Sequence, residues 1–418
     1  FAFEFVNFIK LVNGGESENK TPLVHYKMLD NFVLDNGKDT INMCHRGIAK
    51  LQSGSSKVLT ENGWITMRDL RVGDRVYNRH GQLTTVILKT APQYPRMFNM
   101  TLSDGTVLNV GDEHLHVVKI SSGGKLVEKV LTTLELIERG LTYNTATRKS
   151  VRDPKAQYKW RIPLVDPIQF SEKVLPVSAY TLGLSIANAH YLSGTMACHA
   201  DDLAELIGYI DAEGDKVTDY GTKHGLCGRM YIGKVLKHAY GNVKSKEKTI
   251  PKGALFGSVD QRKELLRGLM DGDGSIAKNG GCTYATDSEE LAKDVVSLVQ
   301  SLGGLASYSS YERDYEDKKR TSYAVRINTV FNPFKLIRKA SKWKPSNKTS
   351  KLIYSIEEVP CTEEGYCIYV ESGDHTYITE GFTITHNSTL KEYLILYLAV
   401  YGSLPGFGKV PYALYVSD

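Results

Sequence analysis

The chain has 418 residues, of which 41% are hydrophobic and 24% are charged, and its formal net charge is +5. This length predicts two or three domains with hydrophobic cores, and so small a charge neither requires nor excludes a nucleic-acid partner. No apolar run is long enough to span a membrane, no signal peptide is recognised, and the six cysteines form no CxxC pair. These features argue against a membrane protein, a zinc site and a disulfide scaffold, and they suit a reducing cytoplasm.

Local patterns divide most of the chain into helical and β-prone stretches. Residues 1–50 contain two helix-like stretches separated by a polar loop. Short β-prone runs with Asn-Gly, His-Gly and Asp-Gly turns between them predict an all-β module in residues 51–120. Helix and strand patterns follow in residues 179–340, and β-prone runs return in residues 351–387. An α+β module therefore interrupts the all-β module.

Two further stretches complete the domain organisation. Residues 121–178 have an ambiguous pattern and are basic in places, so we expect a linker or an accessory DNA-recognition region there. Residues 388–418 begin with an apolar run of helical pattern and stop inside a strand-like run. Because the chain also starts without Met, we expect it to be a fragment of a longer protein.

The two ends of the chain complete one motif when they are joined. Lys50 ends a loop bearing Gly and Ala but lacks the Ser or Thr that should follow, whereas Ser388 and Thr389 open a helix-patterned run. Joining them produces Arg-Gly-Ile-Ala-Lys-Ser-Thr before a helix. That order is typical of a P-loop, in which backbone N–H groups and Lys bind phosphate and Ser or Thr binds Mg²⁺.

This joined loop resembles the variant P-loop of phage terminase large subunits, the ATPases that drive DNA packaging. Ala49 departs from the usual pattern because it replaces the last glycine. The resemblance implies that residues 1–50 and 388–418 are two fragments of such an ATPase. It also implies that ATP phosphates and Mg²⁺ are bound, once the ends are joined, by Arg46, Lys50, Ser388 and Thr389.

The second junction carries residues suited to peptide-bond cleavage. The Asn387 carboxamide can attack its own main-chain carbonyl, which forms a cyclic imide and breaks the bond to Ser388. The Ser388 hydroxyl can hold an acyl group, and His386 can move protons beside this bond near neutral pH. On its own, His-Asn-Ser is more often a polar turn, but its position at the split P-loop favours the chemical role.

Five sequence blocks in order resemble those of inteins, which excise themselves from a host protein. The blocks lie around Gly54, Asp74 and His114, in residues 366–371 and in residues 375–388. The resemblance implies an all-β Hint horseshoe built from residues 51–120 and 351–387. It further implies autocatalytic excision of residues 51–387 with no cofactor and no ATP.

The first residue of the excised segment departs from the usual intein pattern. Ordinary inteins begin with Cys or Ser, but Leu51 has no nucleophile. Cys367 stands where class 3 inteins carry another nucleophilic cysteine, and Thr385 matches the threonine that accompanies it. The third class 3 feature, a Trp, is replaced by His116. The alternatives are that Cys367 is only a small buried side chain and that the first junction is inactive.

The class 3 resemblance implies a pathway for both junctions. The Cys367 thiolate attacks the Lys50 carbonyl, and His114 protonates the leaving amine. The acyl group then moves to the serine of the second junction, and His375 assists cyclisation of the asparagine. The alternative role for His114, Thr385 and His375 is ordinary packing in a β core or turn.

Residues 266–274 resemble the LAGLIDADG motif of homing endonucleases. The resemblance implies two helices packed through small residues, each delivering an acid to a shared divalent-metal site where water attacks a DNA phosphate. Asp273 is the expected carboxylate ligand of Mg²⁺. The first copy of the motif, residues 182–189, has Asn188 where its acid should be. Because Asn is a poor metal ligand, we expect cleavage to be weakened or absent and DNA binding to be retained.

The leading hypothesis is a multidomain chain: an all-β Hint horseshoe interrupted by an α+β LAGLIDADG domain in residues 179–340, flanked by fragments of an α/β P-loop ATPase. We expect double-stranded DNA as partner, no membrane, a monomeric intein, and the cytoplasm of a phage-infected bacterium. A second hypothesis is a DNA-binding homing endonuclease whose Hint module performs only C-terminal cleavage. An ATPase carrying a passenger is disfavoured, because Lys50 and Ser388 belong to one phosphate site.

Overall fold

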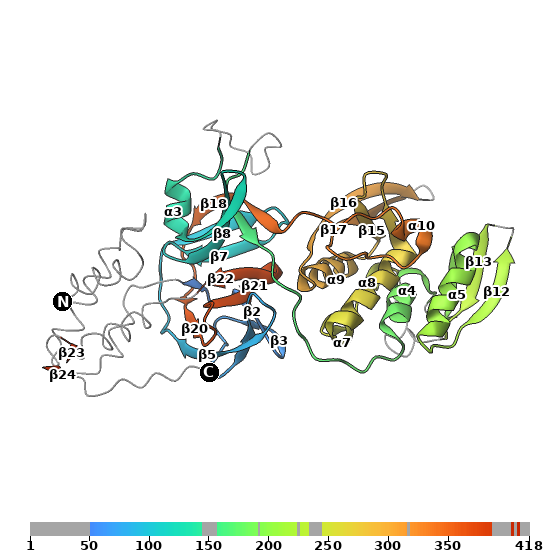
Figure 1. The fold of residues 1–418 in the computed structure, drawn as a ribbon, viewed down its shortest axis with the longest axis horizontal. Helices are drawn as coiled ribbons and strands as arrows, with labels where there is room; N and C mark the ends of the chain where they lie inside the picture. The colour runs from blue at the N-terminus through green and yellow to red at the C-terminus, as the bar shows by residue number, and fades with distance from the viewer. Residues whose placement is uncertain are drawn as a thin grey trace.

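The computed structural model describes residues 51–143, 157–190, 193–223, 226–233, 245–315 and 318–386. Beyond them it describes only two short strands, β23 (Ser403–Leu404) and β24 (Gly408–Lys409). The residues predicted to form the split P-loop and the scissile Asn387–Ser388 bond lie outside the described residues. Figure 1 shows two lobes, one rich in strands and one mixed.

The first lobe is a 15-stranded antiparallel sheet system drawn from both ends of the described chain. From the first part of the chain come β1 (Gln52–Ser53), β2 (Lys57–Thr60), β3 (Gly63–Thr66), β4 (Arg75–Tyr77), β5 (Leu83–Lys89), β6 (Met97–Leu102), β7 (Val107–Gly111), β8 (Leu115–Ser122), β9 (Lys125–Thr132) and β10 (Arg161–Pro163). From the last part come β18 (Ser350–Val359), β19 (Gly365–Tyr366), β20 (Ile368–Val370), β21 (Thr376–Thr379) and β22 (Thr383–His386). The predicted all-β module is therefore present, although it extends beyond the expected strands.

Strands from the two ends alternate within this lobe. The order is β19-β1-β7-β6-β18-β10-β8-β22-β21-β2-β4-β5-β20, with β3 and β9 attached to β2 and β8. Gln52 pairs with Tyr366, and His386 pairs with Leu115. In Figure 1 the blue and red strands accordingly lie side by side. This pairing places the first and last described residues of the predicted excised segment in one sheet system.

Part of the stretch expected to be a linker belongs to this sheet. Strand β9 pairs with β8 along its whole length, helix α3 (Thr133–Glu138) follows it, and β10 joins β8 to β18. The apolar runs in β8 and β9 are short and are interrupted by lysines, so the sequence shows no clear strand pattern there. Within residues 121–178, expected to be a linker or an accessory DNA-recognition region, residues 125–132 and 161–163 therefore form strands of this sheet.

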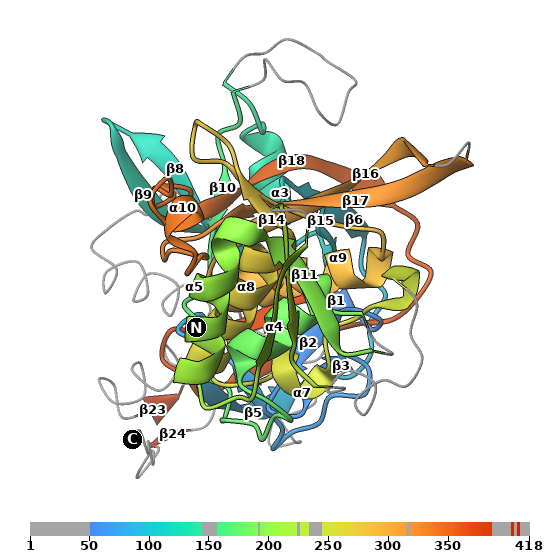
Figure 2. The same ribbon diagram turned by 90° about the vertical axis from the view of Figure 1, so that its right-hand side faces the viewer.

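The second lobe repeats a helix followed by a small sheet. Its first half contains α4 (Ala179–Asn188), β11 (Thr195–His199), η2 (Ala200–Asp202), α5 (Leu203–Ala212), β12 (Thr218–Lys223) and β13 (Cys227–Tyr231). The second half contains η3 (Ser245–Glu247), α7 (Lys252–Leu255), α8 (Val259–Asp273), β14 (Gly274–Ile276), β15 (Cys282–Thr286), α9 (Glu289–Ser301), β16 (Leu305–Tyr315), β17 (Lys318–Asn328) and α10 (Ile337–Ala340). The sheets run β11-β13-β12 and β14-β15-β17-β16, and Figure 2 shows α4 next to α8. The predicted α+β module is present.

Helices α4 and α8 approach each other through glycine. A Cβ atom at Gly183 would lie 2.2 Å from the Leu265 carbonyl oxygen, and one at Gly268 would lie 2.1 Å from that of Tyr180. Any larger residue at either position would therefore force the helices apart. Both helices begin at capping serines, Ser178 and Ser258, whose side chains accept backbone N–H bonds. Within the described residues, no helix is long and apolar enough to cross a membrane.

Candidate functional site

The first junction is marked by the contact between Leu51 and Cys367. Leu51 is 0% exposed and Cys367 is 2% exposed, and the two side chains pack together. The Gly111 N–H donates to the Leu51 carbonyl oxygen at 2.8 Å. The Cys367 N–H donates to Thr90 Oγ1 at 3.0 Å, which holds the cysteine backbone against the neighbouring strand. The predicted nucleophile therefore lies beside the residue that follows the first scissile bond.

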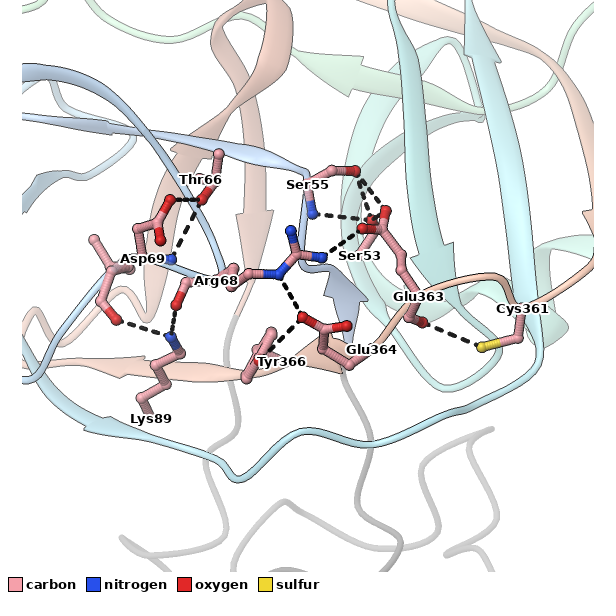
Figure 3. Close-up of polar contacts among 11 residues, drawn as sticks. Ser53, Ser55, Thr66, Arg68, Asp69, Lys89, Cys361, Glu363, Glu364 and Tyr366 are labelled. Atoms are coloured by element: carbon pink, nitrogen blue, oxygen red, sulfur yellow. Dashed lines mark hydrogen bonds and ion pairs between the residues drawn. The ribbon is translucent and has the colours of Figure 1, made fainter.

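A polar cluster attaches β1 to the segment that leads into Cys367, as Figure 3 shows. The Glu363 carboxylate accepts hydrogen bonds from the Ser53 and Ser55 hydroxyls and forms a 2.9 Å ion pair with Arg68. Arg68 also donates to Glu364, whose main-chain oxygen accepts the Gly54 N–H at 2.8 Å. These contacts join segments about 300 residues apart, so they fix the spacing between Leu51 and Cys367.

A buried tyrosine connects the groups around the first junction. Tyr377 is 1% exposed, and its hydroxyl donates to Gln52 Oε1 at 3.3 Å. Burial raises its pKa well above the usual value, the charge of Cys367 adds to this rise, and a hydrogen bond with Thr385 opposes it. Tyr377 and Thr385 are direct partners on β21 and β22. Sequence reasoning assigned no role to Tyr377, and its place in the β-prone run of residues 375–379 was the available signal.

His114 and Thr385 meet in the interior of the β-rich lobe. His114 Nε2 and Thr385 Oγ1 are 2.5 Å apart, and both side chains are buried. His116, which stands at the position of the expected Trp, lies with its ring centroid 5.0 Å from that of His114. Its Nε2 is 3.0 Å from Thr133 Oγ1, and burial holds its pKa well below the usual value. His116 is therefore a neutral packing partner of His114 at neutral pH.

His375 and His386 lie next to the second junction. Their ring centroids are 6.0 Å apart, in an edge-to-face arrangement. His386 ends β22 and pairs with Thr376, the residue after His375. His375 adopts φ of +52°, a left-handed conformation that few residues other than glycine adopt. The two predicted proton carriers therefore lie close together at the end of β22.

The second lobe brings the ends of its two long helices together. Helix α4 ends at Asn188, and α8 ends at Asp273. A Cβ atom on Gly272 would lie 2.4 Å from the Ala187 Cβ and 3.5 Å from Asn188 Nδ2, so the helix ends touch. Burial raises the pKa of Asp273 to about 6, and the nearby Lys248 and Lys339 oppose this rise.

Two buried lysines cap these helices, and sequence reasoning missed both. Lys248 Nζ donates to the carbonyl oxygens of Ile186 at 2.7 Å and Ala187 at 2.9 Å. Lys339 Nζ donates to three carbonyl oxygens at the end of α8, between 2.7 and 2.9 Å. Burial lowers the pKa of Lys248, and it lowers that of Lys339 to about 8. Because each lysine follows the helix that it caps by a similar distance in the chain, the internal repeat was the signal that could have found them.

A polar hollow of about 280 Å³ opens beside Asp273. Its lining includes Lys248 and a second carboxylate, Asp287, which accepts hydrogen bonds from Arg313 at 2.8 Å and Ser322 at 2.7 Å. Among the described residues, no three His, Cys, Asp or Glu side chains are grouped to hold a metal ion. With Asn188 at one helix end, the helices do not supply the pair of carboxylates that the expected Mg²⁺ site needs.

We predict that Asp273→Asn stabilises the protein at pH 8. A folded-state pKa of about 6, raised from 3.8, means that the folded carboxyl holds its proton more tightly than the unfolded one. Stability is therefore lost as the pH rises from about 4 to about 6, and the ionised group costs about 3 kcal/mol above that range. Urea unfolding should show the gain at pH 8 and little gain at pH 4.

The matched control for this prediction is Asp260→Asn on the same helix. The Asp260 side chain is 93% exposed, so its replacement should change stability little at either pH. An equal effect of Asp273→Asn at both pH values would show that Asp273 carries no buried charge.

Known proteins resemble both lobes. Residues 260–332 match the family described as "LAGLIDADG-like domain". A protein named "Replicative DNA helicase DnaB", from Mycobacterium intracellulare, is 27% identical over 370 residues, which cover 84% of this chain and 61% of that protein. The chain therefore contains a LAGLIDADG-like domain, as predicted, and spans about three fifths of the length of this relative.

Solved structures also resemble parts of the chain. The MchDnaB-1 intein (N145AA) is 26% identical with a TM-score of 0.18, covering 26% of this chain and 73% of that one. The gp41-1 intein is 18% identical with a TM-score of 0.16, covering 20% and 75%. I-DmoI in complex with DNA and Ca is 14% identical with a TM-score of 0.28, covering 40% and 95%. Each of these likenesses covers less than half of the chain.

Proposed function

We propose that the chain performs autocatalytic protein splicing, which excises residues 51–387 and joins Lys50 to Ser388. The observation that carries this proposal is the sheet system shared by Gln52 and His386, the strand residues nearest to the two junctions. Cys367 packs on Leu51 at one of them, while His114 contacts Thr385 beside the other. Holding both reacting ends in one rigid fold supplies the proximity that an intramolecular acyl transfer requires.

The first step transfers the N-terminal segment onto Cys367. Its thiolate attacks the Lys50 carbonyl carbon, a C–S bond forms, and the C–N bond to Leu51 breaks. His114 gives the leaving Leu51 nitrogen its proton, which yields a free amine and a thioester. The hydrogen bond from Gly111 to the Leu51 carbonyl keeps this residue in place during the step.

The remaining steps release the segment at its other end. The Ser388 hydroxyl attacks the thioester, which frees the Cys367 thiol and leaves an oxygen ester. Asn387 then cyclises with His386 and His375 as proton carriers, and the bond to Ser388 breaks. The ester rearranges to an amide between Lys50 and Ser388. No cofactor or ATP enters any of these steps.

The joined flanks are proposed to form the P-loop of a terminase ATPase, which binds ATP and Mg²⁺ in the cytoplasm of a phage-infected bacterium. Arg46, Lys50, Ser388 and Thr389 form its phosphate and Mg²⁺ contacts. A second candidate host follows from the DnaB relative, whose name is that of a replicative helicase. The amino-acid sequence of the whole host protein distinguishes the two.

The LAGLIDADG-like domain is proposed to bind double-stranded DNA and to cut it weakly or not at all. The hairpin β16–β17 places Arg313 and Arg320 against Asp287, which lines the hollow at Asp273, and cationic side chains on a strand surface suit phosphate binding. The alternative function is a DNA-binding endonuclease whose β-rich lobe only cleaves after Asn387. Leu51, which cannot act as a nucleophile, is the observation that favours this alternative.

Intact-mass spectrometry of the freshly expressed chain tests the proposal. Splicing is expected to yield residues 1–50 joined to residues 388–418, together with the free segment 51–387. The control Asn387→Ala should block release at the second junction and remove both products. Cleavage after Asn387 without joining would instead establish the alternative, and an unchanged precursor would contradict both.

A further inference from the structure

One hydrogen bond crosses from the LAGLIDADG-like domain to a buried charge in the β-rich lobe. Gln300, in the last turn of α9 and 5% exposed, donates from Nε2 to Asp104 Oδ2 at 2.9 Å. Asp104 lies in the turn between β6 and β7, and its side chain is 0% exposed. A buried carboxylate is stable only when its oxygens are well paired. The LAGLIDADG-like domain therefore helps to satisfy a charge that belongs to the other lobe.

The same carboxylate is paired with a lysine that reaches the C-terminal strand. Lys351, on β18, lies with Nζ 2.7 Å from Asp104 Oδ2 and has a side chain only 1% exposed. Its Nζ also donates to the Gly381 carbonyl oxygen and, at 3.3 Å, to Thr383 Oγ1. Gly381 lies in the turn η4 (Glu380–Phe382), and Thr383 begins β22. A continuous set of buried contacts thus runs from α9 to the strand that carries Thr385.

The turn that precedes β22 has little room to move. Gly381 has φ of +62°, and a Cβ atom there would lie 2.2 Å from Thr106 Oγ1. The Thr106 N–H in turn donates to Asp104 Oδ1 at 3.1 Å. Because the two turns pack directly against each other, a shift of Asp104 moves the start of β22.

A second set of contacts keeps α9 seated on the β-rich lobe. The Ile168 N–H donates to the Ser301 carbonyl oxygen at 3.0 Å. Arg262, fully buried on α8, donates to the same carbonyl oxygen at 2.7 Å and to that of Ile168. Gln300, the residue before Ser301, is therefore presented to Asp104 by a rigid helix end.

We infer that Gln300 is a positioning residue for the splicing reaction, acting through Asp104 and Lys351 on β22. The inference rests on the proposed splicing function and extends it. It makes the LAGLIDADG-like domain a structural part of the splicing element, because the helix end that reaches Asp104 comes from this domain. Loss of the Gln300 bond leaves Asp104 under-satisfied and loosens the strand that presents Thr385 and His386.

The first test is Gln300→Ala in the full chain. Because a hydrogen bond to a charged group is lost, the rate of cleavage at the second junction should fall roughly tenfold. Time-resolved intact-mass spectrometry measures this rate. The matched control is Asp294→Ala on the same helix, since Asp294 Oδ2 accepts the Ile250 N–H at 2.8 Å within the LAGLIDADG-like domain. An equal loss in both variants would overturn the inference, because helix stability would then be the cause.

The variant Gln300→Glu distinguishes a positioning role from a purely structural role through the pH dependence of its cleavage rate. When ionised, the introduced carboxyl repels Asp104, and when protonated it can donate a hydrogen bond as the amide does. The cleavage rate of this variant relative to the parent should therefore rise as the pH falls from 8 to 5. A ratio that does not depend on pH would contradict the inference.

Hydrogen exchange of the backbone amides in β22 measures the effect of Gln300 on this strand even when no splicing occurs. These amides should exchange faster in Gln300→Ala than in the parent, while Asp294→Ala should leave them unchanged. A parent that forms neither joined nor cleaved product defeats the proposed function, whereas the exchange result still decides whether Gln300 holds β22 in place. Unchanged exchange of β22 in Gln300→Ala would overturn it.

Discussion

Replacing Cys367 by alanine is expected to abolish joining of the two flanks, lowering the yield of ligated product by more than about 10³-fold. Leu51 cannot attack the Lys50 carbonyl, and Cys367 packs directly against Leu51. Of the cysteines that the structure describes, the other four lie elsewhere: Cys198, Cys227 and Cys282 in the second lobe, and Cys361 exposed on the loop before β19. Removing one buried sulfur atom lowers the stability of the fold only a little. The expected loss of ligated product therefore comes from loss of the nucleophile.

Intact-mass spectrometry of Cys367→Ala, with Cys361→Ala as the matched control, measures this effect. The control changes the same atoms only a few residues away, so it should splice like the parent. Cleavage after Asn387 should persist in Cys367→Ala, because asparagine cyclisation uses no thiol. Undiminished ligation in Cys367→Ala would show that another group attacks Lys50.

Asn188→Asp is expected to raise double-strand DNA cleavage by about 100-fold or more in the presence of Mg²⁺. The ends of α4 and α8 touch, but they present one amide and one carboxylate. A second carboxylate completes the oxygen ligands that a divalent cation prefers, and metal activation of water is worth several kcal/mol. The substrate is DNA spanning the uninterrupted host gene, and the product is measured by gel electrophoresis.

The pH dependence of this variant provides an internal check. Since burial raises the pKa of Asp273 to about 6, this carboxyl must lose its proton before it can act as a ligand. The cleavage rate should therefore increase as the pH rises through about 6. Asn279→Asp, in the turn between β14 and β15, adds the same charge away from the helix ends and should not cut. Cleavage by the unaltered chain at the rate of the variant would show that Asn188 is not the limiting residue.

Local sequence alone determined the two kinds of module and many of their candidate residues. Short β-prone runs with glycine turns predicted the β-rich lobe, because side chains in strands alternate with a period of two. Residues 266–274 predicted a helix that packs through glycine. No side chain fits at Gly268, because a Cβ atom there would lie 2.1 Å from the Tyr180 carbonyl oxygen. The candidate acid Asp273, and the amide Asn188 in place of a second acid, could also be identified from the sequence. Each of these residues stands at the end of a recognisable helix motif.

Only the tertiary structure revealed which distant residues support these sites. Asp104, Gln300 and Lys351 are isolated polar residues in their local sequences, and nothing near them predicts that they share one buried contact. The same holds for Lys248 and Lys339, whose partners are main-chain oxygens far away in the chain. Local propensity depends on neighbours a few residues away, whereas a buried charge depends on whichever strand or helix end the fold brings to it. For that reason the sequence suggested candidate residues for the chemistry, and only the fold showed which buried contacts join the two lobes.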